Sequence, residues 1–176
     1  MKRTQVLAAL MGLGACLGLV GLSAAQENKV SEVDQKFVRA AASRGLAEVK
    51  AGELAKDRAK SDAVKKFAEQ MVSDHDKANK DLMDLASKKG IRVSKDMREQ
   101  ERTPIDTLSK LKGPAFDAEF LRQQVTAHKE AVSLFEQESK KGKDEDLRSF
   151  AEKTLPTLRE HLKEVTKLAG GERPSR

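Results

Sequence analysis

Apolar residues recur every three or four positions through most of the chain, which is the pattern of amphipathic helices. The clearest example is the stretch 64–85. Its positions on one helical face are Val64, Ala68, Met71, His75, Ala78, Leu82 and Leu85. Six of these seven residues are apolar, and the seventh is a histidine. The stretch therefore predicts a helix that buries one face, with an imidazole at the centre of that face.

The same periodicity, together with helix-terminating residues, predicts four long helices. The expected ranges are 31–59, 62–89, 115–141 and 144–169. Ser31 is suited to cap the first helix, and Gly90 and Gly142 are suited to end the second and third. The connection between the first two helices is short, so they should form an antiparallel hairpin. The fold class that we predict is an all-α four-helix bundle.

The connection between the second and third helices, residues 91–113, is long for a compact domain. Within it, Thr103-Pro104 predicts a short helix over 105–111 with the proline at the first helical position. A connection of this length can run along the bundle rather than turn tightly. An up-down-up-down order and a ferritin-like crossover order both fit this pattern.

Two glycines lie on one face of the first predicted helix. Gly45 and Gly52 are seven residues apart, and each is unfavourable in a helix by about 1 kcal/mol relative to alanine. A close approach to a neighbouring helix at these positions would explain why glycine is used there.

The chain has three histidines, and each lies near the middle of a different predicted helix. They are His75, His128 and His161, and Glu48 lies at a similar height on the remaining helix. In either order of helices the four positions span roughly six residues, or about 9 Å along the bundle. A buried imidazole or carboxylate needs a hydrogen-bond partner. We therefore expect these four residues to form one polar layer in the core.

Helical bundles build metal sites from side chains that converge from facing helices. Imidazole nitrogens and a carboxylate suit transition-metal ions such as zinc, copper or iron. His75, His128, His161 and Glu48 are therefore the candidate metal ligands, and the metal is left open. A purely structural polar layer and acid–base catalysis are the alternatives. The histidines are accompanied by no obvious nucleophile or paired acid, so the sequence favours binding over an enzyme.

A di-iron carboxylate site would place a glutamate three residues before a histidine on two of the helices. The residues found three positions before the histidines are Val72, Val125 and Leu158. The sequence therefore excludes a di-iron site of the usual pattern.

The first 25 residues differ from the rest of the chain. Lys2 and Arg3 precede an apolar run over 6–22, and small residues lead up to Ala25. This is the pattern of a secretory signal peptide cut after Ala25. The prediction is a signal peptide over 1–25 and a periplasmic or secreted helical domain over 26–176.

The only cysteine, Cys16, lies inside this apolar run. The mature chain should then contain no thiol and no disulfide. The residues 13–16 also resemble a lipoprotein signal, which would anchor the protein through Cys16 instead. An uncleaved anchor is a third alternative, since the run barely reaches spanning length.

The charged residues are numerous but of mixed sign. The sequence has 34 basic and 28 acidic residues, for a net charge of +6, and it lacks Trp and Tyr. Nucleic-acid binding would need a basic stripe with stacking aromatics, so we expect no nucleic-acid partner. Weak contact with anionic envelope polymers or a membrane surface is compatible with the small positive excess. No specific partner can be identified from the sequence.

Three segments resemble the domain-of-unknown-function 4142 family of bacteria. They are FAEQMVSDHDKANKDL, FDAEFLRQQVTAHKEAVSLFE and LPTLREHL, which contain His75, His128 and His161 respectively. The resemblance extends over about 37–168. It implies an exported, ferritin-like four-helix bundle without an established activity, and it favours the crossover order of helices.

Two classes of function follow. The first is an exported bundle that binds a metal ion or small ligand through the central histidines. The second is a structural or stress-related envelope protein that acts through its charged surface without a metal. An oxidative-stress enzyme of ferritin-like ancestry is a third and weaker alternative.

Overall fold

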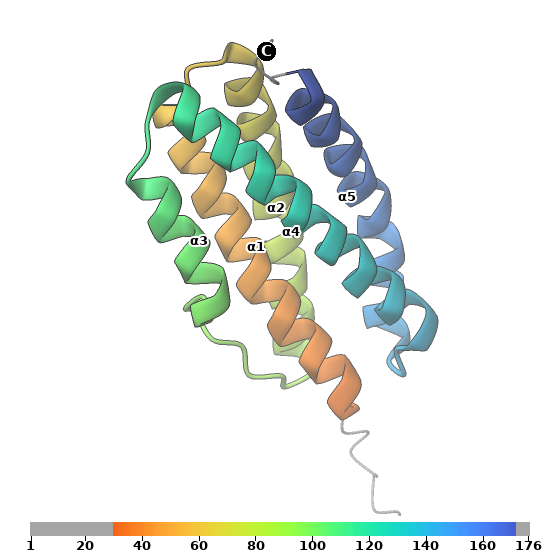
Figure 1. Ribbon diagram of the computed structural model, residues 1–176. Coiled ribbons are helices and arrows are strands. Elements are labelled where there is room, and N and C mark those ends of the chain that lie inside the picture. The colour runs from red at the N-terminus through yellow and green to blue at the C-terminus, as the bar shows by residue number, and fades with distance from the viewer. Residues whose placement is uncertain (1–29, 172–176) are drawn as a thin grey trace, which may run out of the picture.

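The computed structural model describes residues 30–171, which form five helices and, over this range, no strand. The helices are α1 (Glu32–Arg58), α2 (Asp62–Lys88), α3 (Glu99–Ser109), α4 (Gly113–Lys141) and α5 (Glu145–Gly171) (Figure 1). The prediction of an all-α, ferritin-like four-helix bundle with a long connection is confirmed. Each end of the four long helices lies within about two residues of the predicted position. The predicted signal peptide lies outside the described residues.

The bundle has the crossover order of helices. At one end, the Asp117 carboxylate in the first turns of α4 accepts hydrogen bonds from the backbone N–H groups of Lys60, at 3.0 Å, and Ser61, at 2.9 Å. At the other end, Asp34 of α1 accepts hydrogen bonds from the backbone of Lys143 and Asp144, between α4 and α5. Therefore α4 begins beside the α1–α2 turn and runs parallel to α2, and the long connection travels the length of the bundle (Figure 1).

The helix within the long connection differs from the prediction. It was expected over 105–111 with Pro104 at its first position, but α3 begins at Glu99 and Pro104 lies inside it. The cause is a contact with α1: Ser43 Oγ accepts a hydrogen bond from the Arg98 N–H and donates one to the Glu101 carboxylate. These hydrogen bonds hold the first turn of α3 in place. The predicted start relied only on the position of Pro104 in the sequence, so it could not take a contact with α1 into account.

The core consists of two apolar clusters. The Phe37 cluster includes Phe37, Leu82, Phe135, Leu147 and Leu158. The Phe67 cluster includes Phe67, Met71, Phe116, Leu121 and Val165. On each of the four long helices, buried polar residues lie between the members of the two clusters, and the ones nearest mid-helix form a single layer. These residues are Glu48, His75, His128 and His161, which we call the polar layer.

The two glycines of α1 mark a close approach to α2. A Cβ atom on Gly52 would lie 2.5 Å from Cγ2 of Val72, and one on Gly45 would lie 1.8 Å from Oδ1 of Asn79. The close approach predicted from the sequence is confirmed. It brings α1 against the helix that carries His75.

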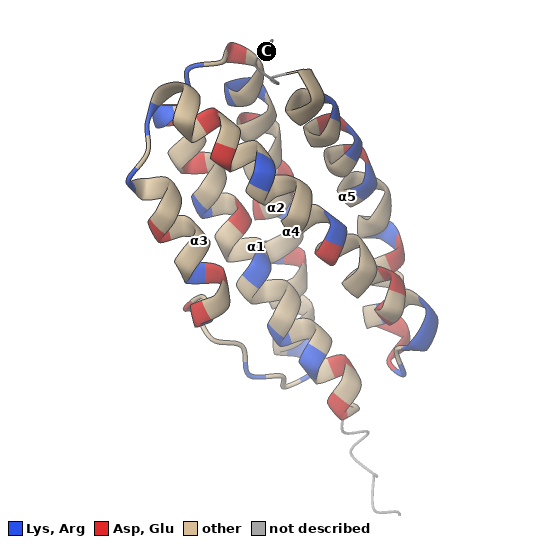
Figure 2. Cartoon of the chain, viewed as in Figure 1, with Lys and Arg blue, Asp and Glu red and all other residues tan. Residues whose placement is uncertain are grey.

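The outer faces of the helices carry basic and acidic residues side by side (Figure 2). Many form ion pairs one turn apart, such as Lys36–Glu32 and Lys77–Asp81. Exposed pairs of this kind contribute little to stability. Among residues 30–171, no helix combines the length and the apolar character needed to cross a membrane.

Candidate metal centre

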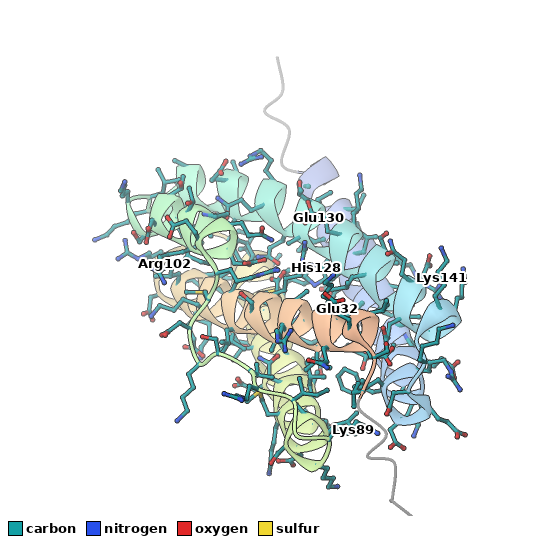
Figure 3. The ribbon with its side chains drawn as sticks, turned by 90° about the horizontal axis from the view of Figure 1, so that it is seen from below. Glu32, Lys89, Arg102, His128, Glu130 and Lys141 are labelled. Carbon is teal, nitrogen blue, oxygen red and sulfur yellow. The ribbon has the colours of Figure 1, made fainter. Side chains whose placement is uncertain are left out.

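His75, His128 and His161 converge in the middle of the bundle from α2, α4 and α5. One nitrogen from each lies within 4.8 Å of the others. The three ring centroids are 5.4 to 5.6 Å apart. The side chains are buried, with exposed fractions of 8%, 0% and 1%, and Figure 3 shows His128 enclosed by the helices. We call these three residues the histidine group.

Hydrogen bonds to the outer nitrogens define which nitrogens are free. His128 Nδ1 lies 3.0 Å from the backbone carbonyl of Gln124, and His161 Nε2 lies 3.0 Å from the Asp74 carboxylate. Both oxygens act as acceptors, so these nitrogens carry the protons. The lone pairs then remain on His128 Nε2 and His161 Nδ1. These two atoms and His75 Nε2 are buried and have no hydrogen-bond partner within the described part of the chain.

Burial keeps the imidazoles neutral. It lowers the pKa of His128 to about 4 and that of His75 well below its usual range. Burial also lowers the pKa of His161, although the hydrogen bond to Asp74 opposes this shift. At neutral pH all three rings are therefore neutral, and each has one unprotonated nitrogen, which is the form that binds metals.

The size of the group suits a single ion. A metal bound to imidazole lies about 2.0–2.1 Å from each nitrogen, so two such nitrogens on a tetrahedral ion are about 3.3 Å apart. The upper limit of 4.8 Å between the donors therefore needs only small side-chain rotations to close on an ion. The hydrogen bonds from His128 and His161 to oxygen acceptors are the outer interactions that orient metal-binding histidines.

An apolar wall and a solvent cleft border the group. Phe67 packs against His128 and His161, with ring centroids 6.4 and 6.0 Å away. A cleft of about 320 Å³ between α2 and α5 reaches His75 and His161. Asp74 lies at this cleft with 36% of its side chain exposed. The cleft thus brings solvent to the side chains of two of the three histidines.

The fourth predicted ligand, Glu48, is adjacent to the group but does not belong to it. It is buried in the polar layer, and burial raises its pKa to about 7, opposed by Gln124, His161 and Arg44. Glu48 and His75 line a small cavity of about 30 Å³. The carboxylate is not among the donors that lie within 4.8 Å of one another. The structure thus brings three of the four predicted residues together.

Two contacts of the group could not be found by sequence reasoning. Asp74 directly precedes His75 in the chain, yet its carboxylate accepts from His161 on another helix. The partner of His128 is a backbone carbonyl, which every residue of a helix possesses. Only the packing of α2 against α5 and the rotamer of His128 select these partners, and neither has a local signature.

The fold and the site define a class: four-helix bundles with a buried three-histidine group. The model of the family described as Domain of unknown function (DUF4142) matches residues 20–168, and the chain belongs to this family. No curated protein matches the chain in sequence.

Several solved structures have a similar fold. A DUF305 fragment from Deinococcus radiodurans is similar with a TM-score of 0.72 and 14% identity, over 81% of this chain and 98% of that one. CopM in the Cu(II)-bound form is similar with a TM-score of 0.68 and 16% identity, over 80% and 97%. A conserved hypothetical protein from Mycobacterium tuberculosis has a TM-score of 0.63 and 12% identity, over 82% and 95%. At such identities the likeness concerns the fold alone.

Proposed function

We propose that this protein binds one transition-metal ion through His75, His128 and His161. Two observations carry the proposal: one nitrogen of each ring lies within 4.8 Å of the others, and each ring has a buried nitrogen with no hydrogen-bond partner within residues 30–171. Each buried polar atom left unpaired costs about 1–3 kcal/mol. One metal ion would satisfy all three nitrogens at once.

Copper is the first ion to test, and zinc is the second. Imidazole suits both metals, and CopM, whose fold is similar, has been solved with Cu(I) and with Cu(II) bound. The three donors are neutral and no carboxylate belongs to their group. A monovalent ion loses less hydration free energy than a divalent ion when it is buried among neutral donors. This argument favours Cu(I).

The surroundings suit holding or transferring the ion rather than catalysis. Phe67 forms an apolar wall against two of the rings, and Asp74 orients His161 from the edge of the α2–α5 cleft. An ion bound here would be largely shielded from water and would exchange through this cleft. We therefore propose a metal-binding protein that stores or passes on the ion.

A thermal unfolding experiment tests the proposal. Cu(I) or Zn(II) at neutral pH should raise the melting temperature, because a ligand at a hundred times its Kd stabilises the native state by about 2.7 kcal/mol. His128→Ala should abolish the rise, whereas Lys129→Ala, on the exposed neighbouring position, should retain it. If neither ion shifts the wild-type protein, or if His128→Ala responds equally, the polar layer is structural. A surface role in the envelope then becomes the better account.

We also propose that the protein is exported, on the basis of the basic and then apolar pattern of residues 1–25. The mature protein should then begin at Gln26. Mass spectrometry of the protein from its native host tests this prediction. An intact N-terminus would contradict it, and a lipidated Cys16 would show that the protein is anchored instead.

A further inference from the structure

A second cavity lies between α1, α3 and α4. Its volume is about 690 Å³, within the range of small-molecule sites. α3 forms one wall, because the crossover connection places this helix against the outside of α1 and α4 (Figure 1). The cavity differs from the α2–α5 cleft that leads to His75 and His161. We call it the α3 cavity.

Three residues that carry unpaired buried polar atoms line the α3 cavity. Glu48 Oε2, Gln124 Oε1 and Arg44 Nε have no hydrogen-bond partner among the described residues. Glu48 and Gln124 are only 6% and 3% exposed. Outside the histidine group and this cavity, the one other such atom found within residues 30–171 belongs to Glu138. Buried polar atoms without partners are rare in native proteins, so their gathering at one cavity points to a ligand.

The charges of the lining favour a cation. Four carboxylates line the cavity against two guanidinium groups. Glu130 pairs with Arg44 at 2.7 Å, and Glu119 pairs with Arg122 at 2.6 Å. Glu101, the third carboxylate, accepts hydrogen bonds from Arg98 and Ser43.

Glu48 is thus the lining carboxylate without an ion pair among the described residues. The Gln124 side chain hydrogen-bonds to Glu48, and its own oxygen Oε1 is an unpaired acceptor beside it. Ala47, Ala51 and Ile105 supply apolar surface in the same cavity. A ligand that complements this lining carries N–H donors and a short hydrocarbon part.

We propose that the α3 cavity binds a small primary alkylammonium ion, whose N–H groups donate to Glu48 and Gln124 and whose carbon chain packs on Ala47, Ala51 and Ile105. This gives Glu48 a role separate from the histidine group. The proposal does not depend on metal binding, since it rests on a different cavity.

Calorimetric titration of the purified, metal-free protein tests the proposal with three compounds of equal carbon number. These are 1,4-diaminobutane, 1,4-butanediol and succinate. Only the diamine should bind. Glu48→Gln should weaken its binding about tenfold or more, the usual effect of losing a hydrogen bond to a charged group. Glu53→Gln, an exposed glutamate of the same helix, should leave the affinity unchanged.

A second variant and a mapping experiment locate the ligand. Ala47→Leu fills the cavity without touching its charges and should also weaken diamine binding. In NMR spectra, the diamine should shift amide signals of α1, α3 and α4 rather than those at the α2–α5 cleft. Equal binding of the diol, retention of affinity in both variants, or shifts centred on His75 and His161 would overturn the proposal, as would a lack of diamine binding.

Discussion

For single residues, the decisive feature is which nitrogen of each histidine carries the proton. The Gln124 backbone carbonyl and the Asp74 carboxylate accept hydrogen bonds from the N–H groups of His128 Nδ1 and His161 Nε2. The remaining lone pairs lie on His128 Nε2 and His161 Nδ1, which are buried and have no hydrogen-bond partner among residues 30–171. Asp74 is a positioning residue, because it touches His161 and not the proposed ion.

Replacing Asp74 should weaken metal binding without removing a ligand. We expect Asp74→Asn to lower the metal affinity about 10- to 100-fold, as is usual for outer partners of metal-binding histidines. The matched control is Asp81→Asn, which lines the same cleft but contacts Lys77 rather than a histidine. Competition with a chelator measures both affinities. Equal losses in the two variants would show that only the charge of the cleft matters.

Glu138 is a second buried carboxyl group with a shifted pKa. Burial and the neighbouring carboxylates of Asp34 and Asp144 raise its pKa to about 7. The folded state therefore favours the protonated form, and its contribution to stability is present below pH 4.5 and is lost as the pH rises through about 7.

Glu138→Gln should consequently stabilise the protein above pH 7 relative to the wild type, since an amide keeps a donor and cannot ionise. The gain should shrink toward pH 4.5, where the wild-type carboxyl is protonated as well. Urea unfolding across this range measures the difference. Glu136→Gln, at a half-buried residue of the same helix that pairs with Arg159, should show no such gain. A gain that is equal at all pH values would contradict the account.

For the helical elements, the approach of α1 to α2 determines where His75 lies. Gly52→Ala would place a Cβ atom 2.5 Å from Cγ2 of Val72 and 3.2 Å from the backbone oxygen of Ala68. We expect a loss of about 1–3 kcal/mol in the free energy of unfolding, which is typical of overpacking. Gly170→Ala, where no atom of the described residues lies within 4 Å of the new Cβ, should be neutral or slightly stabilising. Equal effects would contradict the close approach.

The long helices could be predicted because each buries one continuous face, and the spacing of the apolar residues along the sequence identifies that face. Gly45 and Gly52 were informative because they share one face of α1, and this predicted the close approach to another helix that the structure shows. The start of α3 could not be predicted, because it depends on Ser43 from another helix. The sequence did not decide between the two possible orders of helices. The order follows from hydrogen bonds between the Asp117 carboxylate and the backbone of Lys60 and Ser61, which are far from Asp117 in the sequence.

The candidate site was predicted only in part, for a similar physical reason. The heights of Glu48, His75, His128 and His161 follow from counting residues, and all four do lie between the two core clusters. Their separation within that layer depends on helix rotation and side-chain rotamers. The three histidines converge, whereas Glu48 also lines the α3 cavity.

For the whole molecule, the buried histidines should make the fold sensitive to acid. Burial depresses their pKa values, so their contribution to stability is complete above the unfolded pKa of about 6.5 and is lost as the pH falls toward about 4, the folded value for His128. Over this interval the free energy of unfolding should fall less for His128→Gln than for the wild type. The difference between the two should reach up to about 1.4 kcal/mol per pH unit. Urea unfolding at several pH values measures this, with Lys129→Gln as the control. Parallel curves for wild type and His128→Gln would contradict it.

Native mass spectrometry after copper or zinc loading tests the central claim most directly. We expect one ion per chain in the wild type and none after replacing His75, His128 and His161 together by alanine. Circular dichroism should confirm that this variant is helical, and single His128→Ala provides a milder second variant. Wild-type protein that holds no ion, or variants that hold as much as the wild type, would contradict a metal centre built from these three histidines.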